Sequence, residues 1–170
     1  MLQNTPAATA PFTLSRTFGA TQAQLFAAFT EPELMKHWWA PKGVDIVKAT
    51  MDLRPGGSYH YCMRPPQGPD MWGKFAFLEV EAPRRLVFLN SFSDADGGLS
   101  RHPMAPTWPA QMHSVFLFEP AADGAQFTME WSPHEGSVEE TATFNAGRDG
   151  MKAGWTGTLN QLDAWLASAK

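Results

Sequence analysis

The sequence predicts an α+β fold of the helix-grip type, in which a curved antiparallel sheet of six or seven strands wraps around one long C-terminal helix. Residues 44–132 consist of short β-type runs separated by turn signals. Consecutive strands with short connections form an antiparallel meander rather than a parallel sheet. The last third of the chain repeats apolar residues at helical spacing, which predicts an amphipathic helix. The sheet is the only large apolar surface available to receive that helix.

The N-terminal part of the chain predicts one strand followed by two short helices. Residues 12–18 alternate apolar and polar side chains, which is the pattern of a half-buried strand. Thr21 and Gln24 have the spacing of a helix capping box, and an apolar helical stripe follows them. Pro32 separates this helix from a second short helix, which Pro41 ends because proline lacks the N–H group that a helix interior needs.

Six β-type runs and one long loop follow the short helices. The Asp123-Gly124 pair is the sharpest hairpin signal, because these residues tolerate the positive φ of such turns. The loop at residues 93–110 is longer than most connections, and Leu99, Met104 and Trp108 give it apolar weight. It is either a lid over a cavity or a surface for a partner. The six runs are 44–53, 58–64, 71–80, 86–92, 112–119 and 126–132.

The predicted C-terminal helix has one apolar face, and four glycines lie beside it. Each glycine inside a helix costs roughly 0.8–1 kcal/mol relative to alanine. Either the helix backbone closely approaches another element there, or the missing side chains leave volume for a ligand. In a third interpretation the helix begins only after Gly150, with Gly147 in a turn. The apolar face consists of Phe144, Met151, Trp155, Leu159, Leu162 and Leu166, and the glycines are Gly147, Gly150, Gly154 and Gly157.

Length and charge limit the class of protein. A chain of 170 residues fits one domain, and we expect residues 11–170 to form it after a flexible leader at residues 1–10. The net charge of -4 argues against a nucleic-acid partner, which requires clustered lysine and arginine. No apolar run approaches the roughly 18 residues of a membrane span. The N-terminus lacks the basic and apolar regions of a secretory signal, so we expect a cytoplasmic protein.

The sequence carries no pattern for a metal, a cofactor or a nucleotide. Its 5 histidines show no metal-ligand spacing, and Cys62 is the only cysteine, so we expect neither a metal site nor a disulfide. Glycine-rich nucleotide loops and the serine-hydrolase motif are absent from the sequence. We therefore expect no cofactor.

Several stretches, in order, resemble one known family. The arrangement of a strand, two short helices, a meander and a long helix is similar to the START-like superfamily, also called SRPBCC or birch-pollen-allergen-like. Within it, the chain resembles the AHSA-type branch, related to the C-terminal domain of the activator of the ninety-kilodalton heat-shock-protein ATPase. The resemblance spans roughly residues 12–168 and implies a helix-grip fold with an apolar cavity between sheet and helix, where members bind or transform hydrophobic small molecules. The resemblance to the AHSA-type branch rests on five stretches of sequence: Trp38-Trp39-Ala40-Pro41, Leu53-Arg54-Pro55-Gly56-Gly57, Gly73 with Glu79, Pro83-Arg84-Arg85-Leu86-Val87-Phe88, and Gly154-Trp155 followed by Leu159 and Leu162.

Aromatic side chains make up 12% of the chain, with 7 Trp and 12 Phe, and such rings either fill a core or line an apolar pocket. Asn90 and Ser114 lie in phase with the rings, so each needs a hydrogen-bond partner from backbone, water or ligand. Arg148 lies within the apolar helix face and either extends to water or reaches the cavity mouth to bind a carboxylate. By strand phase and by resemblance, the candidates for ligand binding are Trp38, Trp39, Tyr59, Tyr61, Trp72, Phe88, Asn90, Phe92, Met129, Trp131, Arg148, Met151 and Trp155.

Three functions stay open at this point. The first is binding of an apolar or aromatic small molecule between the sheet and the C-terminal helix. The second is an enzyme of cyclase, hydrolase or lyase type in the same cavity, using His37, His102, Glu79 or Arg148, although no acid–base pair can be read from the sequence. The third is an interaction protein associated with a chaperone, by analogy with the family. A homodimer is a further partner prediction, because the 93–110 loop could cover a second copy.

Overall fold

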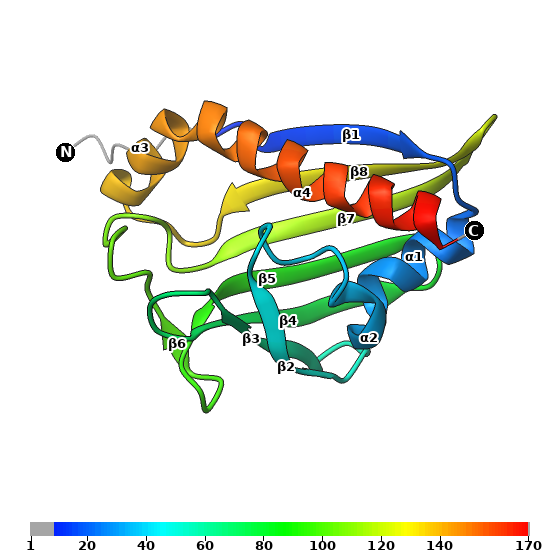
Figure 1. Ribbon diagram of the computed structural model, residues 1–170. Coiled ribbons are helices and arrows are strands. Elements are labelled where there is room, and N and C mark those ends of the chain that lie inside the picture. The colour runs from blue at the N-terminus through cyan, green and yellow to red at the C-terminus, as the bar shows by residue number, and fades with distance from the viewer. Residues whose placement is uncertain (1–8, 170) are drawn as a thin grey trace.

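The computed structural model describes residues 9–169, so most of the leader expected at residues 1–10 lies outside the described residues. The predicted α+β architecture is confirmed: one antiparallel sheet carries the long C-terminal helix across one face (Figure 1). Its strands follow the order β1-β8-β7-β5-β4-β3-β2, and a short eighth strand, β6, pairs with β5. The strands are β1 (Phe12–Phe18), β2 (Asp45–Met51), β3 (Ser58–Arg64), β4 (Met71–Glu81), β5 (Arg85–Ser93), β6 (Leu99–Ser100), β7 (Met112–Ala121) and β8 (Gly124–Pro133).

Two short helices follow β1, as the sequence predicts. In α1 (Gln22–Thr30) the capping box is present: the Gln24 N–H donates to Thr21 Oγ1 at 3.1 Å, and the Thr21 N–H donates to Gln24 Oε1 at 2.9 Å. The second helix, α2 (Pro32–Met35), begins with its proline, which suits a first position because the N–H there has no helical partner. Trp38 follows α2 and donates its indole N–H to the Ala28 carbonyl at 3.0 Å.

The centre of the molecule is a ring-packed core between the sheet and α1. Phe29 of α1 is 2% exposed and stacks on Phe127 of β8, with ring centroids 4.7 Å apart. Phe116 of β7 presents its ring edge to Phe29 at 5.6 Å and to Phe88 of β5 at 4.8 Å. Phe88 in turn stacks on Phe75 of β4 at 4.2 Å. This part of the interior is therefore filled by side chains.

The helical C-terminal third consists of two helices rather than one: α3 (Val138–Ala146) and α4 (Arg148–Ser168). Gly147 lies at the break, and a side chain there would meet the Thr143 carbonyl oxygen and Trp108 Cζ3, each at 3.3 Å. A second capping box, Ser137 with Glu140, starts α3. The side chains that α4 buries are the predicted ones: Met151, Trp155, Leu159 and Leu162. None of the helices within residues 9–169 combines the length and hydropathy of a membrane span.

The close-approach interpretation of the helix glycines holds only at Gly147. At Gly150, Gly154 and Gly157 a Cβ atom would find nothing within 4 Å, and all three positions are exposed. Their missing side chains therefore leave open space beside α4.

This open space predicts that Gly157→Ala stabilises the protein. Alanine is favoured over glycine inside a helix, so we expect the free energy of unfolding to rise by about 0.5–1 kcal/mol in chemical denaturation. The matched control is Gly147→Ala, where Thr143 and Trp108 crowd the new methyl group and no gain is expected. Destabilisation by Gly157→Ala would contradict this description of the helix surface.

Candidate functional site

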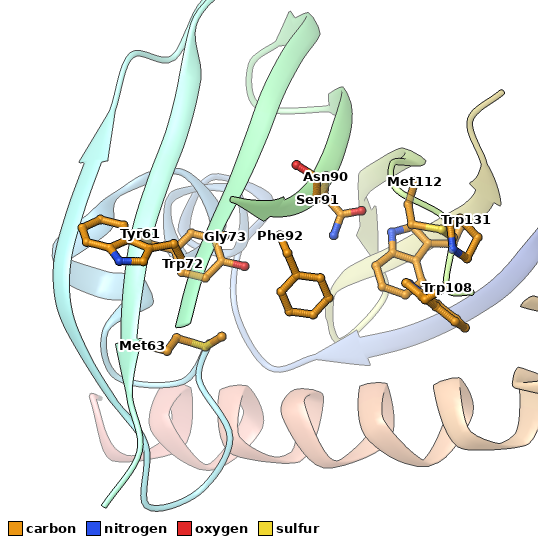
Figure 2. A pocket seen from close by; sticks show the side chains of 11 residues that line it. Tyr61, Met63, Trp72, Gly73, Asn90, Ser91, Phe92, Trp108, Met112 and Trp131 are labelled. Carbon is orange, nitrogen blue, oxygen red and sulfur yellow. The ribbon is translucent and has the colours of Figure 1, made fainter. Parts of the chain in front are cut away.

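A pocket of about 130 Å³ lies on the inner face of the sheet, near the end that the 93–110 loop covers. Strands β3, β4, β5, β7 and β8 supply its floor, and the loop adds Trp108 as a wall (Figure 2). Pro109, the next residue of the loop, also lines the pocket. The lining carries no formal charge among its residues, which are Tyr61, Met63, Trp72, Gly73, Asn90, Ser91, Phe92, Trp108, Pro109, Met112 and Trp131. Five of the residues predicted for ligand binding are therefore brought together: Tyr61, Trp72, Asn90, Phe92 and Trp131.

Gly73 makes room for the Tyr61 ring at one side of this pocket. The two residues are directly opposite on β4 and β3, and a Cβ on Gly73 would lie 2.5 Å from both Cζ and Oη of Tyr61. Tyr61 also stacks on Tyr59 at 4.8 Å and meets the edge of Trp39 at 6.3 Å. Burial raises the pKa of the Tyr61 hydroxyl, with the Trp39 side chain lowering it in part. The hydroxyl is therefore neutral at physiological pH.

A polar chain crosses the opposite side of the pocket. The Trp131 indole N–H donates to Ser114 Oγ at 2.7 Å, and Ser114 Oγ donates to Asn90 Oδ1 at 3.4 Å. Ser114 is fully buried. The partners that Asn90 and Ser114 need are therefore supplied by side chains from neighbouring strands.

The 93–110 loop is fastened over the pocket by one arginine. Arg101 donates to the carbonyl oxygens of Pro106 and Trp108, at 3.3 and 3.0 Å, and to Glu140 Oε1 of α3 at 2.6 Å. Thr143 and Thr107 add a hydroxyl contact of 3.0 Å between helix and loop. The loop therefore covers one side of the pocket and is attached to α3, and this segment is called the lid below.

Acid is expected to loosen this lid. Hydrogen bonds from the Ser137 backbone and then from Arg101 lower the pKa of Glu140. Since the folded-state pKa is lowered, the ionised carboxylate stabilises the attachment above the usual glutamate range, and this stabilisation is lost as pH falls through the lowered pKa. The protection factors of the loop amides, which compare their hydrogen exchange with the intrinsic rate at each pH, should therefore fall below about pH 4.

Two substitutions check the role of Glu140 in that acid response. Glu140→Gln should accelerate exchange of the loop amides already at neutral pH and flatten the pH response. Glu139→Gln, on the exposed side of the same helix turn, should change neither. A pH response that survives in Glu140→Gln would assign the effect to another group.

A second, more open groove of about 300 Å³ runs beside α4. It holds three further predicted residues, Trp39, Met151 and Trp155, and it shares Trp131 with the pocket. The rings of Trp155 and Trp131 meet edge to face at 5.5 Å. Gly154, whose missing side chain leaves open space, completes one wall together with Pro41 and Thr158.

The remaining predicted residues lie elsewhere. Trp38, Tyr59, Phe88 and Met129 are each at most 1% exposed and belong to the core. Arg148 leaves the apolar helix face and donates to the backbone carbonyls of Ala10 and Pro11 and to Asn145 Oδ1. The arginine thus ties the start of β1 to the α3–α4 junction, apart from both the pocket and the groove.

The residues considered for acid–base chemistry are dispersed. His37 stacks on Trp165 at 5.4 Å, and Glu79 pairs with Arg85 at 3.4 Å. His102 lies against Phe92 at 5.2 Å and lines a wider hollow of about 440 Å³ on the far side of Trp72 and Phe92. Within residues 9–169, no group of three or more His, Cys, Asp or Glu side chains is arranged to hold a metal ion.

Gly73, Trp108 and Arg101 belong to the site but were not among the predicted ligand-binding residues, and the signals that they carry in the sequence differ. Gly73 is a glycine inside a strand, which often marks close approach. Trp108 is the one tryptophan within the long loop. Arg101 has no local signal, because its partner Glu140 lies 39 residues away in the chain.

Comparison with known proteins shows which family the chain resembles. The model of the family described as "Activator of Hsp90 ATPase homolog 1-like protein" matches residues 19–167. Among curated proteins, none matches the chain. Solved structures share the fold. Ms6760 from Mycobacterium smegmatis has 25% identity and a TM-score of 0.73 over 93% of this chain and 91% of that one. NE0264 from Nitrosomonas europaea has 27% identity and a TM-score of 0.72, over 96% and 97%.

Proposed function

The chain belongs to the family of Activator of Hsp90 ATPase homolog 1-like proteins, and we propose that it binds a small apolar or aromatic molecule in the pocket beneath the 93–110 loop. The observation that carries this proposal is the lining: five aromatic residues line a space without any formal charge, and they are Tyr61, Trp72, Phe92, Trp108 and Trp131. Burial of apolar ligand surface against them contributes roughly 25 cal/mol per Å².

The size of the pocket limits the ligand. A cavity of about 150 Å³ lined by apolar side chains holds a benzene-sized molecule, and this pocket measures about 130 Å³. The pocket is therefore slightly smaller than that cavity and takes one ring, whose substituents reach toward its open side. Longer ligands extend past Trp72 and Phe92, which also border the wider neighbouring hollow.

Binding without turnover is the expected behaviour. The pocket lining includes no Asp, Glu, His, Lys or Arg, so none of these lining side chains supplies the acid and base that a cyclase, hydrolase or lyase mechanism uses. The ligand is instead held by ring contacts and oriented by the few polar groups of the wall.

Calorimetric titration with a panel of small aromatic compounds tests the proposal. We expect saturable one-to-one binding that Trp108→Ala, which removes a wall of the pocket, weakens about tenfold, equivalent to about 1.4 kcal/mol. Trp165→Ala removes a ring on α4 that lines neither the pocket nor the groove and is the matched control. Equal weakening by both variants, or no saturable binding by the native protein, would refute the proposal.

A further inference from the structure

The polar chain at the pocket wall has a fixed direction. An indole N–H can only donate, so Ser114 Oγ accepts from Trp131. A serine hydroxyl has a single proton, which is then available for the bond to Asn90. Asn90 turns its Oδ1 atom toward Ser114 and accepts that proton, and this contact gives the orientation of its amide.

This orientation turns the amide NH₂ group of Asn90 toward the pocket. Figure 2 shows the Asn90 nitrogen directed toward Phe92, away from the oxygen that faces the Trp131 side. Among the described residues, no side chain or carbonyl accepts a hydrogen bond from Asn90 Nδ2. A hydrogen-bond donor at the wall of an apolar pocket is paired when an acceptor enters.

The rest of the lining determines which acceptor suits this donor. No lysine or arginine lines the pocket, so a carboxylate would lose its hydration without gaining a cation. A neutral carbonyl oxygen has a much smaller free-energy cost of desolvation, and in the pocket it accepts a hydrogen bond from the Asn90 N–H. The neutral hydroxyl of Tyr61 faces the same pocket and adds a second polar group.

We propose that the pocket selects neutral aromatic carbonyl compounds, with Asn90 as the specificity-determining donor and Ser114 as the residue that positions it. This inference rests on the proposed binding function and narrows its ligand class. It excludes aromatic acids as good ligands and ranks a hydrocarbon of the same shape below the ketone.

Three compounds of matched shape test the selectivity by calorimetry: acetophenone, α-methylstyrene and benzoate. The native protein should bind acetophenone about three- to tenfold more tightly than α-methylstyrene, which is the range of one net hydrogen bond, and benzoate most weakly. Equal affinities for the ketone and the hydrocarbon would overturn the inference while leaving the proposed function intact. Absence of binding by all three would overturn both.

Asn90→Asp separates the donor from the rest of the side chain. The aspartate keeps an oxygen for the Ser114 hydroxyl and replaces the donating NH₂ group by a charged carboxylate oxygen that can only accept, so the preference for acetophenone should disappear. Asn145→Asp, the same change on an exposed α3 position, should keep the preference, and retention of it by Asn90→Asp would contradict the inference. If Asn90→Asp does not fold, the side-chain amide resonance of Asn90 in the native protein tests the same point. Acetophenone should shift this resonance and α-methylstyrene should not, and equal shifts would contradict the inference.

The positioning role of Ser114 has its own readout. Ser114→Ala frees the Asn90 amide to rotate, so the affinity ratio of acetophenone to α-methylstyrene should fall while the α-methylstyrene affinity stays the same. A purely structural role would weaken both compounds equally and would overturn this part of the inference.

Discussion

Gly73→Ala is expected to abolish ligand binding and to destabilise the fold. The new methyl group would lie 2.5 Å from Cζ and Oη of Tyr61, and no real Cβ contact is that short. Tyr59, Trp39 and Phe75 hold the Tyr61 ring at centroid distances of 4.8, 6.3 and 6.0 Å. The ring must then move into the pocket, or β3 and β4 must separate. Overpacking of this kind costs about 1–3 kcal/mol.

Calorimetry with acetophenone and chemical denaturation measure both consequences of Gly73→Ala. Gly150→Ala is the matched control, because a Cβ there meets nothing within 4 Å, and it should bind acetophenone normally. If Gly73→Ala folds poorly, Met63→Trp fills the pocket from its partly exposed edge and should also prevent binding. Native affinity in both pocket variants would contradict the assignment of the site.

Phe116→Ala is expected to cause the largest loss of stability, about 3–5 kcal/mol. Phe116 is 1% exposed and lies at the centre of the ring-packed core, with Phe29, Phe88, Phe127 and Trp155 at 5.6, 4.8, 5.0 and 5.9 Å. Its removal deletes apolar burial and leaves a cavity that rigid rings on several elements cannot fill. Chemical denaturation measures the loss.

Leu117→Ala on the same strand is the control for Phe116→Ala. Leu117 points to the opposite face of the sheet and is half-buried, so its truncation should cost much less. Similar losses for the two variants would contradict the description of the inner face as the core of the molecule.

Local sequence signals predicted the elements that local physics determines. The Thr21–Gln24 capping box and the Asp123-Gly124 hairpin form as expected. Ser137 and Glu140 have the same capping-box spacing in the sequence, which marks the start of a helix at Val138. The apolar face by itself nevertheless suggested one continuous helix through Gly147. The register of β4 against β5 shifts between Phe77 and Glu79, and a bulge of this kind has no clear signature in a single sequence.

The position of the pocket could not be predicted, because it depends on contacts between distant segments. Strand phase correctly grouped Tyr61, Asn90, Phe92 and Trp131 on the inner face. The alternation of side chains along a strand does not show which inner-face side chains the helices cover. It therefore grouped core residues such as Phe88 and Met129 with the pocket residues. The lid arises from the Arg101–Glu140 pair, and the direction of the Asn90 amide arises from Trp131, two strands away in the sheet.

The most direct test of the binding site is a ¹H–¹⁵N spectrum of the 7 tryptophan indole groups during titration with acetophenone. Trp72 and Trp108 line the pocket alone, Trp39 and Trp155 line the α4 groove alone, Trp131 lines both, and Trp38 and Trp165 line neither. We expect the Trp72, Trp108 and Trp131 resonances to shift together and saturate while those of Trp38 and Trp165 stay in place. Shifts of Trp39, Trp155 and Trp131 that leave Trp72 and Trp108 in place would put the ligand in the groove and contradict the proposed site.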